Sequence, residues 1–353
     1  MRLVDRYIAH AIWVNILLSL LVLGGMDMLF AFIAELEDIS ETYRLSDAAV
    51  YALATFPRRC YEFMGVSSLM GTLLGLGGLA SNSELTVMRA AGISLARIVM
   101  AALIPVMCFA LVAVLLGQFV IPSTEQYGQT YRAIQQGGGQ MLRVKQGNWH
   151  REGNEVIHIT AIGADGTLHG VKRFRFSDEG ELIAMSHAQT AKRESNQWIL
   201  EQDQTTVLSL SEIKASSSAV LPWASQLTLE MVEMVVSRPE FLSMTRLYSY
   251  TRFLKNQGLD NRDYILAFWK KVLQPVATAI MVLIAVSFIF GPLRSVTVGL
   301  RIMVGLVVGL VFNYMQDFMV HASAVFSVAP WVAAITPITV FFGVGLLLLR
   351  RVR

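Results

Sequence analysis

Two charged side chains, Glu84 and Arg89, lie in a short polar stretch, residues 81–95, between two long apolar runs. Leu85 and Met88 recur at helical spacing within it, which predicts an amphipathic helix of a few turns. A helix this short between two membrane spans either rests on lipid headgroups or docks into a groove on another protein. We expect docking, with Leu85 and Met88 as apolar contacts and Glu84 and Arg89 as polar ones.

The ends of this short helix are also marked in the sequence. Ser81 or Ser83 is expected to cap its start, and Gly92 to end it, because glycine enters the left-handed conformation at little steric cost. A carboxylate in the first turn of a helix is favoured by the helix dipole in any protein. A purely local, dipole-stabilising role for Glu84 therefore stays open beside docking.

No other residues are grouped in a way that predicts catalysis or metal binding. The two cysteines, Cys60 and Cys108, fall at different depths of two apolar runs, too far apart to pair. The sequence has no Cys or His cluster at ligand spacing, no phosphate-binding glycine loop, no Ser-His-Asp pattern and no dinucleotide fingerprint. We expect no enzymatic activity, no metal and no cofactor in this chain.

The composition is that of a membrane protein. Of its 353 residues 54% are hydrophobic and only 16% are charged, and the mean hydropathy is +0.52, whereas soluble domains carry roughly a quarter charged residues. The net charge of +3 comes from dispersed basic residues, which argues against a nucleic-acid partner. We therefore expect lipid to be the main solvent of the fold.

Six apolar runs can each reach the ~20 residues that a helix needs to cross a bilayer. They form two groups of three, separated by about 140 residues, and the first one lacks a convincing cleavage site. The runs are Ile8–Met26, Phe63–Ala80, Ile98–Thr124, Val272–Leu293, Ile302–Gln316 and Ala322–Leu349.

The distribution of lysine and arginine predicts the orientation. With both termini in the cytoplasm, more of the basic residues next to the spans fall on the inner side, as the positive-inside rule requires. This places residues 81–95 in the cytoplasm and the large middle segment in the periplasm of a Gram-negative cell. The predicted division is 1–126 for three spans with the short helix, 127–263 for the periplasmic domain and 264–353 for three more spans.

The middle segment reads as β-structure. Apolar and β-branched residues alternate or cluster between turn signals at Gly153-Asn154, Asp165-Gly166, Asp178-Glu179-Gly180 and Ser195-Asn196. Strands are expected over Asn148–Ile162, Thr167–Phe176, Glu181–Thr190 and Gln197–Ser209. Short strands at near-regular spacing predict a sandwich or a jelly roll, and residues 243–256 then predict an amphipathic helix leading to the fourth span.

Three motifs carry a resemblance to a known family. They are Asp5-Arg6-Tyr7-Ile8, the run from Ser83 to Gly92, and Phe288-Ile289-Phe290-Gly291-Pro292-Leu293-Arg294-Ser295. Together with the order of three spans, a β domain and three spans, they resemble the LptF/LptG permease subunits of the bacterial lipopolysaccharide exporter. The last motif resembles the LptG branch more than the LptF branch.

The resemblance implies an ABC transporter of the inner membrane that extracts lipopolysaccharide and passes it to a periplasmic bridge. It implies a heterodimer with LptF, two copies of the ATPase LptB that bind ATP and Mg, LptC at the side, and a bridge to LptA. In that family the helix after the second span docks into the ATPase. Glu84, Leu85, Met88 and Arg89 would then form the ATPase-coupling site.

Arg132 and Arg301 are candidates for the substrate path. The resemblance puts Arg132 near the cavity exit, where it could bind lipid phosphates, although a surface arginine explains it equally well. The outer end of the first span carries the acidic residues Glu35, Glu37 and Asp38, which puts lipid phosphate binding at this rim in doubt. Arg301, just inside the fifth span, either lines the cavity or reaches lipid phosphates. Asp27, Asp317 and His321 lie near span ends, and no role is assigned to them.

Glycines at positions 71 and 75, and again at 305 and 309, form GxxxG motifs, for which packing within the chain is the expected cause. Two other function classes stay open: a permease of the same architecture for a different amphiphile, and a membrane-anchored sensor or scaffold with a periplasmic ligand. The sensor would need no docking helix.

Overall fold

The computed structural model describes residues 3–40, 43–136, 142–162, 166–194, 197–208, 213–225, 239–256, 259–291, 296–326 and 328–351. Within them, six helical segments are long and apolar enough to cross a membrane. They are α1 (Leu3–Glu35), α2 (Leu45–Ser81), a third span made of α4 (Leu95–Leu115), the π-helical turn η2 (Leu116–Val120) and α5 (Ile121–Gln136), then α8 (Arg262–Phe290), α9 (Val298–Phe326) and α10 (Pro330–Arg351). The prediction of six spans in two groups of three is confirmed.

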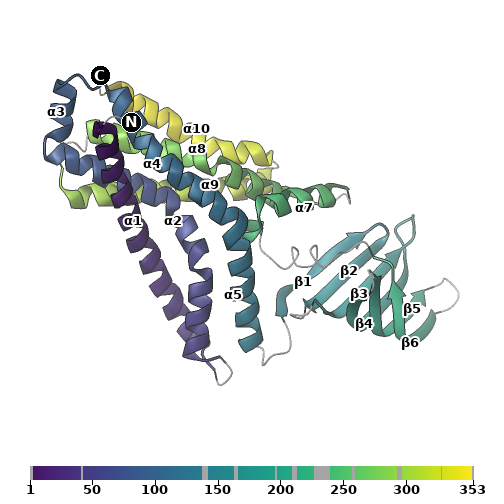
Figure 1. The fold of residues 1–353 in the computed structure, drawn as a ribbon. Coiled ribbons are helices and arrows are strands. Elements are labelled where there is room, and N and C mark those ends of the chain that lie inside the picture. Colours follow the sequence, from purple (N-terminus) through teal and green to yellow (C-terminus); the bar gives the residue numbers. More distant parts are fainter. Residues whose placement is uncertain are drawn as a thin grey trace.

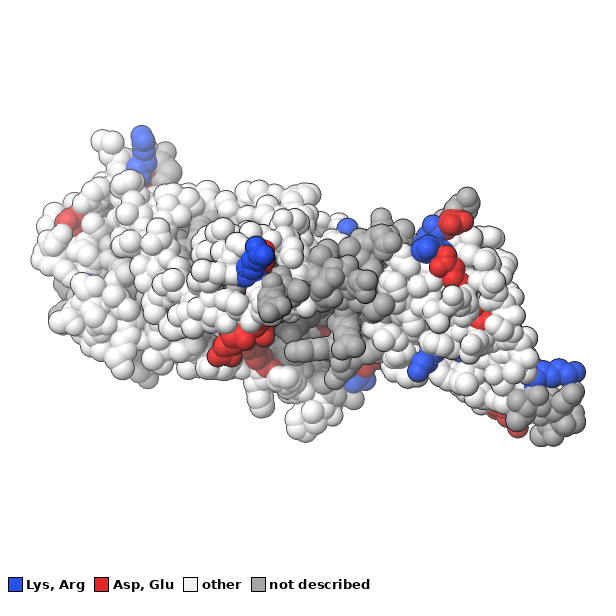
Figure 2. All heavy atoms as spheres, turned by 90° about the horizontal axis from the view of Figure 1, so that it is seen from below, with Lys and Arg blue, Asp and Glu red and all other residues white. Residues whose placement is uncertain are grey.

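The helices form a bundle with distinct ends. Figure 1 shows both termini beside the short helix α3 (Glu84–Ala90) at one end of the bundle, and a β-sheet beyond the other end. We call these the α3 end and the sheet end. Seen from below, the helical part is covered over wide areas by uncharged side chains, whereas charges of both signs lie over the sheet (Figure 2). An uncharged surface on long helices is what a lipid environment requires.

The helix α2 is the most enclosed of the six spans, and its glycines explain how its neighbours approach it. A Cβ added at Gly71 would lie 2.5 Å from the Cα atom of Ile16 in α1, and one at Gly75 would lie 2.9 Å from the Cα atom of Ile12. Gly305 and Gly309 of α9 contact Met70 and Val66 of α2 in a similar way. Both GxxxG motifs therefore pack helices within this chain, as expected.

The observed helices extend beyond the charge-free runs. The second helix starts at Leu45 and not at Phe63. Two arginines inside it are paired with neighbouring helices, Arg58 with Glu125 of α5 at 3.1 Å and Arg59 with Asp27 of α1 at 2.7 Å. The predicted start of the sixth span at Ala322 is wrong, since α9 continues to Phe326 and α10 begins at Pro330. Proline is well suited to the first turn of a helix, where its missing N–H is not needed.

The middle segment contains a single antiparallel sheet among the described strands, in sequential order. The strands are β1 (Leu142–Glu152), β2 (Glu155–Ile162), β3 (Leu168–Phe176), β4 (Leu182–Glu194), β5 (Gln197–Leu208) and β6 (Ile213–Trp223). The stretch Asn148–Ile162 is not one strand but part of the hairpin of β1 and β2, which turns at the predicted Gly153-Asn154, and the φ of Gly153 is +58°. The β domain is confirmed, but the described strands form a meander, so the crossing connections of a jelly roll are not among them.

The core of the sheet comes from alternating side chains on one face. Ile157, Val171, Trp198 and Leu200 are fully buried there, as period-two alternation requires. Strand β6 escaped prediction because its run of serines and alanine has no apolar alternation. The chain returns to the bundle through the 3-10 turn η3 (Pro239–Phe241) and the helix α7 (Met244–Asn256), which confirms the helix predicted there.

Candidate functional site

The short helix α3 spans seven residues, fewer than the predicted stretch. It ends as predicted: Gly92 has a φ of +87°, and the N–H groups of Gly92 and Ile93 donate to the carbonyls of Arg89 and Met88, which closes the helix. The predicted serine cap is wrong. Ser83, at the N-cap position, makes no side-chain capping bond, and Ser81 donates instead to the carbonyl of Gly77 in α2.

The apolar face of α3 points into its own bundle. Leu85 is only 3% exposed and belongs to the main core, and Met88 packs against the same core. The prediction that Leu85 is a docking contact is therefore wrong, because its side chain is already covered by this chain. The outward face of α3 carries Thr86, Val87 and Ala90, and Val87 is 66% exposed.

Glu84 and Arg89 both contact neighbouring helices. The hydroxyl of Tyr7 in α1 is hydrogen-bonded to the Glu84 carboxylate, which also accepts from the side chain of Asn82 at 3.3 Å. The Arg89 guanidinium lies over the Phe290 ring at the end of α8, 5.8 Å from its centroid. Through these contacts and the buried Leu85, α3 is attached to α1, to the end of α8 and to the main core of the bundle.

The N-terminal motif lies at the same end and continues this network. Asp5 receives two hydrogen bonds from Arg97 at the start of α4, at 3.0 and 3.2 Å, while Tyr7 reaches Glu84 and Ile8 is buried in the core. These two motifs, some 80 residues apart in the chain, are brought together only by the fold, and no local pattern in either one predicts this. The third motif is only partly visible, since Pro292 to Ser295 lie outside the described residues.

Arg301 is buried, not directed to lipid. Its side chain is 1% exposed, and its Nη1 donates to the Ser81 Oγ at 3.0 Å. Gly77 makes room for it, since a Cβ there would lie 2.8 Å from the Arg301 Cδ. The reading of a side chain that reaches lipid phosphates is therefore wrong, and the burial gives no support to a place on the substrate path. Arg301 ties the start of α9 to the last residue of α2, next to α3.

At the sheet end, the acidic residues at the end of the first span pair with an arginine of the same chain. Arg132 of α5 lies 3.0 Å from the Glu35 Oε2 and 2.6 Å from the Asp38 Oδ2, and its guanidinium stacks over the Tyr51 ring. Burial and the neighbouring Glu35 carboxylate raise the pKa of the Tyr43 hydroxyl, which donates to Glu35. Glu35 and Asp38 therefore hold Arg132 between the first and third spans, and a contact of Arg132 with lipid phosphate stays a prediction.

The remaining ionisable residues singled out from the sequence have simpler surroundings. Asp27 pairs with Arg59, and Asp317 lies 3.4 Å from the Lys270 Nζ at an exposed position. His321 is exposed. Within the described residues no group of three His, Cys, Asp or Glu side chains is placed to hold a metal ion.

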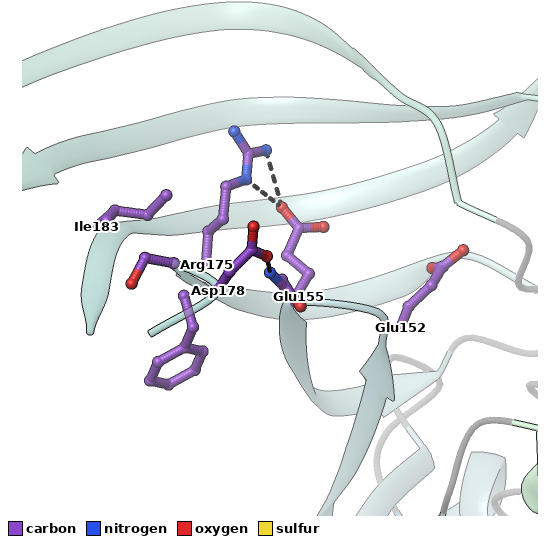
Figure 3. A pocket seen from close by; sticks show the side chains of 8 residues that line it. Glu152, Glu155, Arg175, Asp178 and Ile183 are labelled. Carbon is purple, nitrogen blue, oxygen red and sulfur yellow. Dashed lines mark hydrogen bonds and ion pairs between the residues drawn. The ribbon is translucent and has the colours of Figure 1, made fainter. Parts of the chain in front are cut away.

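An open hollow lies in the β domain beside the hairpin turn of β1 and β2. Figure 3 shows Arg175 directed at Glu155, and Asp178 joined by a dashed line to a neighbouring side chain. Arg175 donates to Glu155 at 2.9 Å, Asn154 donates to Asp178 at 2.6 Å, and Glu152 accepts from Ser225 at 2.7 Å. Its polar groups satisfy one another, so the hollow gives no ground for a ligand site.

Comparisons with known proteins agree with this architecture. The family model of the lipopolysaccharide export system permeases LptF/LptG matches residues 6–351. The lipopolysaccharide export system permease protein LptG of Escherichia coli strain K12 is 33% identical over 351 residues, which cover 98% of each chain. The LptG protein of Haemophilus influenzae is 32% identical over 355 residues, covering 99% of this chain and 98% of the relative.

Proposed function

The chain belongs to the LptF/LptG family of lipopolysaccharide export permeases, and from this premise we propose that α3 couples its spans to the ATPase of an ABC transporter. The chain is the permease subunit and not the catalytic one, since ATP hydrolysis in such a transporter sits in a partner. The observation that carries this function is the match over nearly the whole chain, with six apolar helices and an inserted β domain.

The proposed assembly follows the family. The chain pairs with LptF, rests on two copies of LptB, which bind ATP and Mg, associates with LptC and delivers lipopolysaccharide toward LptA. The α3 end and both termini face the cytoplasm of a Gram-negative cell, and the β domain projects into the periplasm. The excess of basic residues on one side of the spans supports this orientation.

The geometry of α3 refines how it docks. The outward surface of Thr86, Val87 and Ala90 supplies the apolar contact with the ATPase, and Glu84, half-exposed at the start of the helix, supplies an oriented polar one. Leu85 and Met88 hold α3 to the spans instead of touching the partner. With one face bound to the ATPase and the opposite face packed on the spans, α3 can pass movement from one to the other.

The test is a set of variants of the assembled complex. Glu84→Arg brings a positive charge to a cationic contact on the partner and should weaken the free energy of association by a few kcal/mol. Less ATPase should therefore copurify, and ATP-driven lipopolysaccharide release should fall. Glu84→Ala should do less, and Glu84→Asp, which keeps the charge, less again. Val87→Asp should weaken assembly by placing a carboxylate in the apolar contact, while Glu179→Arg in an exposed turn of the β domain serves as the control.

The outcomes separate docking from a purely local role of Glu84. If Glu84 only stabilises the helix dipole, Glu84→Arg and Glu84→Ala soften α3 by about 1 kcal/mol or less and the complex still assembles. Normal assembly and transport in both Glu84→Arg and Val87→Asp would remove α3 from the ATPase contact.

The orientation has its own measurement. In a background without Cys60 and Cys108, a membrane-impermeant thiol reagent added to cells with a permeabilised outer membrane should label Ser217→Cys in β6 and leave Ser83→Cys unlabelled. Labelling of Ser83→Cys from outside would reverse the proposed topology.

A further inference from the structure

The face of the sheet opposite its core carries a row of aromatic and basic side chains. Antiparallel pairing places one residue from each of five neighbouring strands side by side in this row. We call it the outer row: Trp149 of β1, His158 of β2, Lys172 of β3, His187 of β4 and Gln204 of β5. The next row on the same face consists of Arg151, Val156, Phe174, Met185 and Thr206. Successive side chains of a strand point to opposite faces, so both rows face away from the buried Ile157 and Val171.

The aromatic end of the outer row is open to solvent. The Trp149 side chain is 63% exposed. Its ring is held by two neighbours, with centroid distances of 4.7 Å to His158 and 5.8 Å to Phe174. The π face of an indole is electron-rich and apolar, and the C–H groups on one side of a sugar ring are complementary to it. A held and exposed indole is therefore suited to stacking on a sugar.

The cations beside this indole have no carboxylate in their own rows. Lys172, His187 and Arg151 are exposed, and the ten residues of the two rows include no aspartate or glutamate. Other cations of the sheet are paired, as Lys192 is with the Glu201 Oε1 at 3.2 Å. The two rows therefore form a surface of positive charge that is complementary to an anion, and phosphate accepts charge-assisted hydrogen bonds from lysine and arginine.

The size of this surface favours a small ligand over a protein or a bilayer. Five strands about 4.8 Å apart and two rows about 7 Å apart cover about 300 Å², whereas a stable protein interface buries about 800 Å² on each partner. Among the apolar side chains of the two rows, only Trp149 and Met185 are exposed. Association with a bilayer surface needs a larger apolar face than two side chains supply.

We propose that the outer row and its neighbouring row bind a phosphorylated saccharide, namely the sugar-phosphate part of lipopolysaccharide. Trp149 stacks on a sugar ring, and Lys172 and Arg151 donate to phosphate oxygens. Two strand spacings, about 10 Å, separate Trp149 from Lys172, which one sugar ring with its phosphate can bridge. In Figure 1 these strands lie beyond the sheet end of the bundle. The inference rests on the proposed export function and adds a site for the polar part of the substrate outside the spans.

The experiment uses the full complex with its permease and ATPase partners in liposomes that contain lipopolysaccharide. Met185, which is 44% exposed in the neighbouring row, is replaced by the photo-crosslinking residue benzoylphenylalanine. Illumination during ATP-driven transport should give an adduct with lipopolysaccharide, identified by immunoblotting and mass spectrometry. Deacylated, phosphorylated oligosaccharide in excess should reduce the yield of this adduct about tenfold, and the same oligosaccharide after phosphatase treatment should compete far less.

Matched variants separate binding by these residues from mere proximity. Lys172→Gln and Trp149→Ala should each lower the adduct yield about tenfold, while Trp149→Phe, which keeps a stacking ring, should retain most of it. Lys192→Gln removes an exposed lysine of the same sheet that is already paired with Glu201, and should behave as wild type. Benzoylphenylalanine at Glu179, in an exposed turn, should give no such adduct.

The proposal is overturned if the crosslinker at Met185 captures only phospholipid or only protein, or if no adduct forms while lipopolysaccharide is released. It is also overturned if Lys172→Gln combined with Trp149→Ala keeps the wild-type yield, or if the dephosphorylated oligosaccharide competes as well as the phosphorylated one. Failure of the export function has a different signature, namely wild-type complex that recovers no ATPase and releases no lipopolysaccharide.

Discussion

The contact between α1 and α2 depends on Gly71, and a single methyl group should measurably weaken it. An alanine Cβ at this position would lie 2.5 Å from the Cα, N and Cγ1 atoms of Ile16, about 0.9 Å inside the 3.4 Å at which ordinary contact begins. Two of those three atoms are backbone, so no rotamer change relieves the overlap and the whole helix α1 must move away. Overpacking of this kind typically costs about 1–3 kcal/mol.

The control for Gly71→Ala is on the same helix. Gly78 is exposed, and a Cβ there meets nothing within 4 Å. Both substitutions gain roughly the same 1 kcal/mol of helix propensity, so the difference in unfolding free energy between the two variants isolates the overlap. We expect Gly71→Ala to be less stable than Gly78→Ala by about 1–3 kcal/mol in denaturant titrations in detergent. Equal stability of the two variants would refute close packing of α1 on α2.

Three further outcomes follow from particular contacts. Arg132→Gln leaves the Glu35 carboxylate without its cation and should lower the free energy of unfolding by about 1–2 kcal/mol, after allowance for the partial exposure of Arg132. In a double-mutant cycle, adding Glu35→Gln should recover part of that loss. Additive effects of the two substitutions would contradict the pairing. Ser81→Ala removes the acceptor of the Arg301 hydrogen bond and should lower stability by about 1–3 kcal/mol, whereas a silent substitution would mean that the bond is not formed. Burial, and to a smaller extent the charge of Lys172, lower the pKa of His158 below its usual 6.5. The substitution Lys172→Gln should therefore raise the pKa of His158 in an NMR titration. The stability that depends on neutral His158 should be present above about pH 6.5 and lost as the pH falls through the lowered pKa.

The membrane spans and most turns could be predicted because their signals are local. Hydropathy over about 20 residues finds a span, and a glycine with a positive φ, such as Gly92 or Gly180, marks the end of an element. The lengths of the spans could not be predicted in the same way. The charges that seem to end the second span, Arg58 and Arg59, are neutralised by Glu125 and Asp27 on helices far away in the sequence.

The short helix α3 was predicted from the sequence, but the direction of its apolar side was not, because Leu85 and Met88 pack into the core of this chain. Helical periodicity shows that Leu85 and Met88 share one side of α3, but it does not show whether a partner or the chain's own bundle covers that side. The same limit applies to Arg301 and Arg132, whose residue type suggests phosphate binding and whose environment in this chain is Ser81 and a pair of carboxylates. Function at such positions depends on pairings that no sequence window contains.

The packing around α2 has a consequence for how lipopolysaccharide leaves the membrane. Glycine contacts hold α1 and α9 against α2 at near-backbone distance, Arg301 ties α9 to the end of α2, and Arg132 ties the third span to the end of α1. Closely packed elements of this kind shift as rigid bodies and do not deform continuously. A path for a lipid between α1 and α2 would have to separate these near-backbone contacts, so the packing within this chain disfavours a gap at that place.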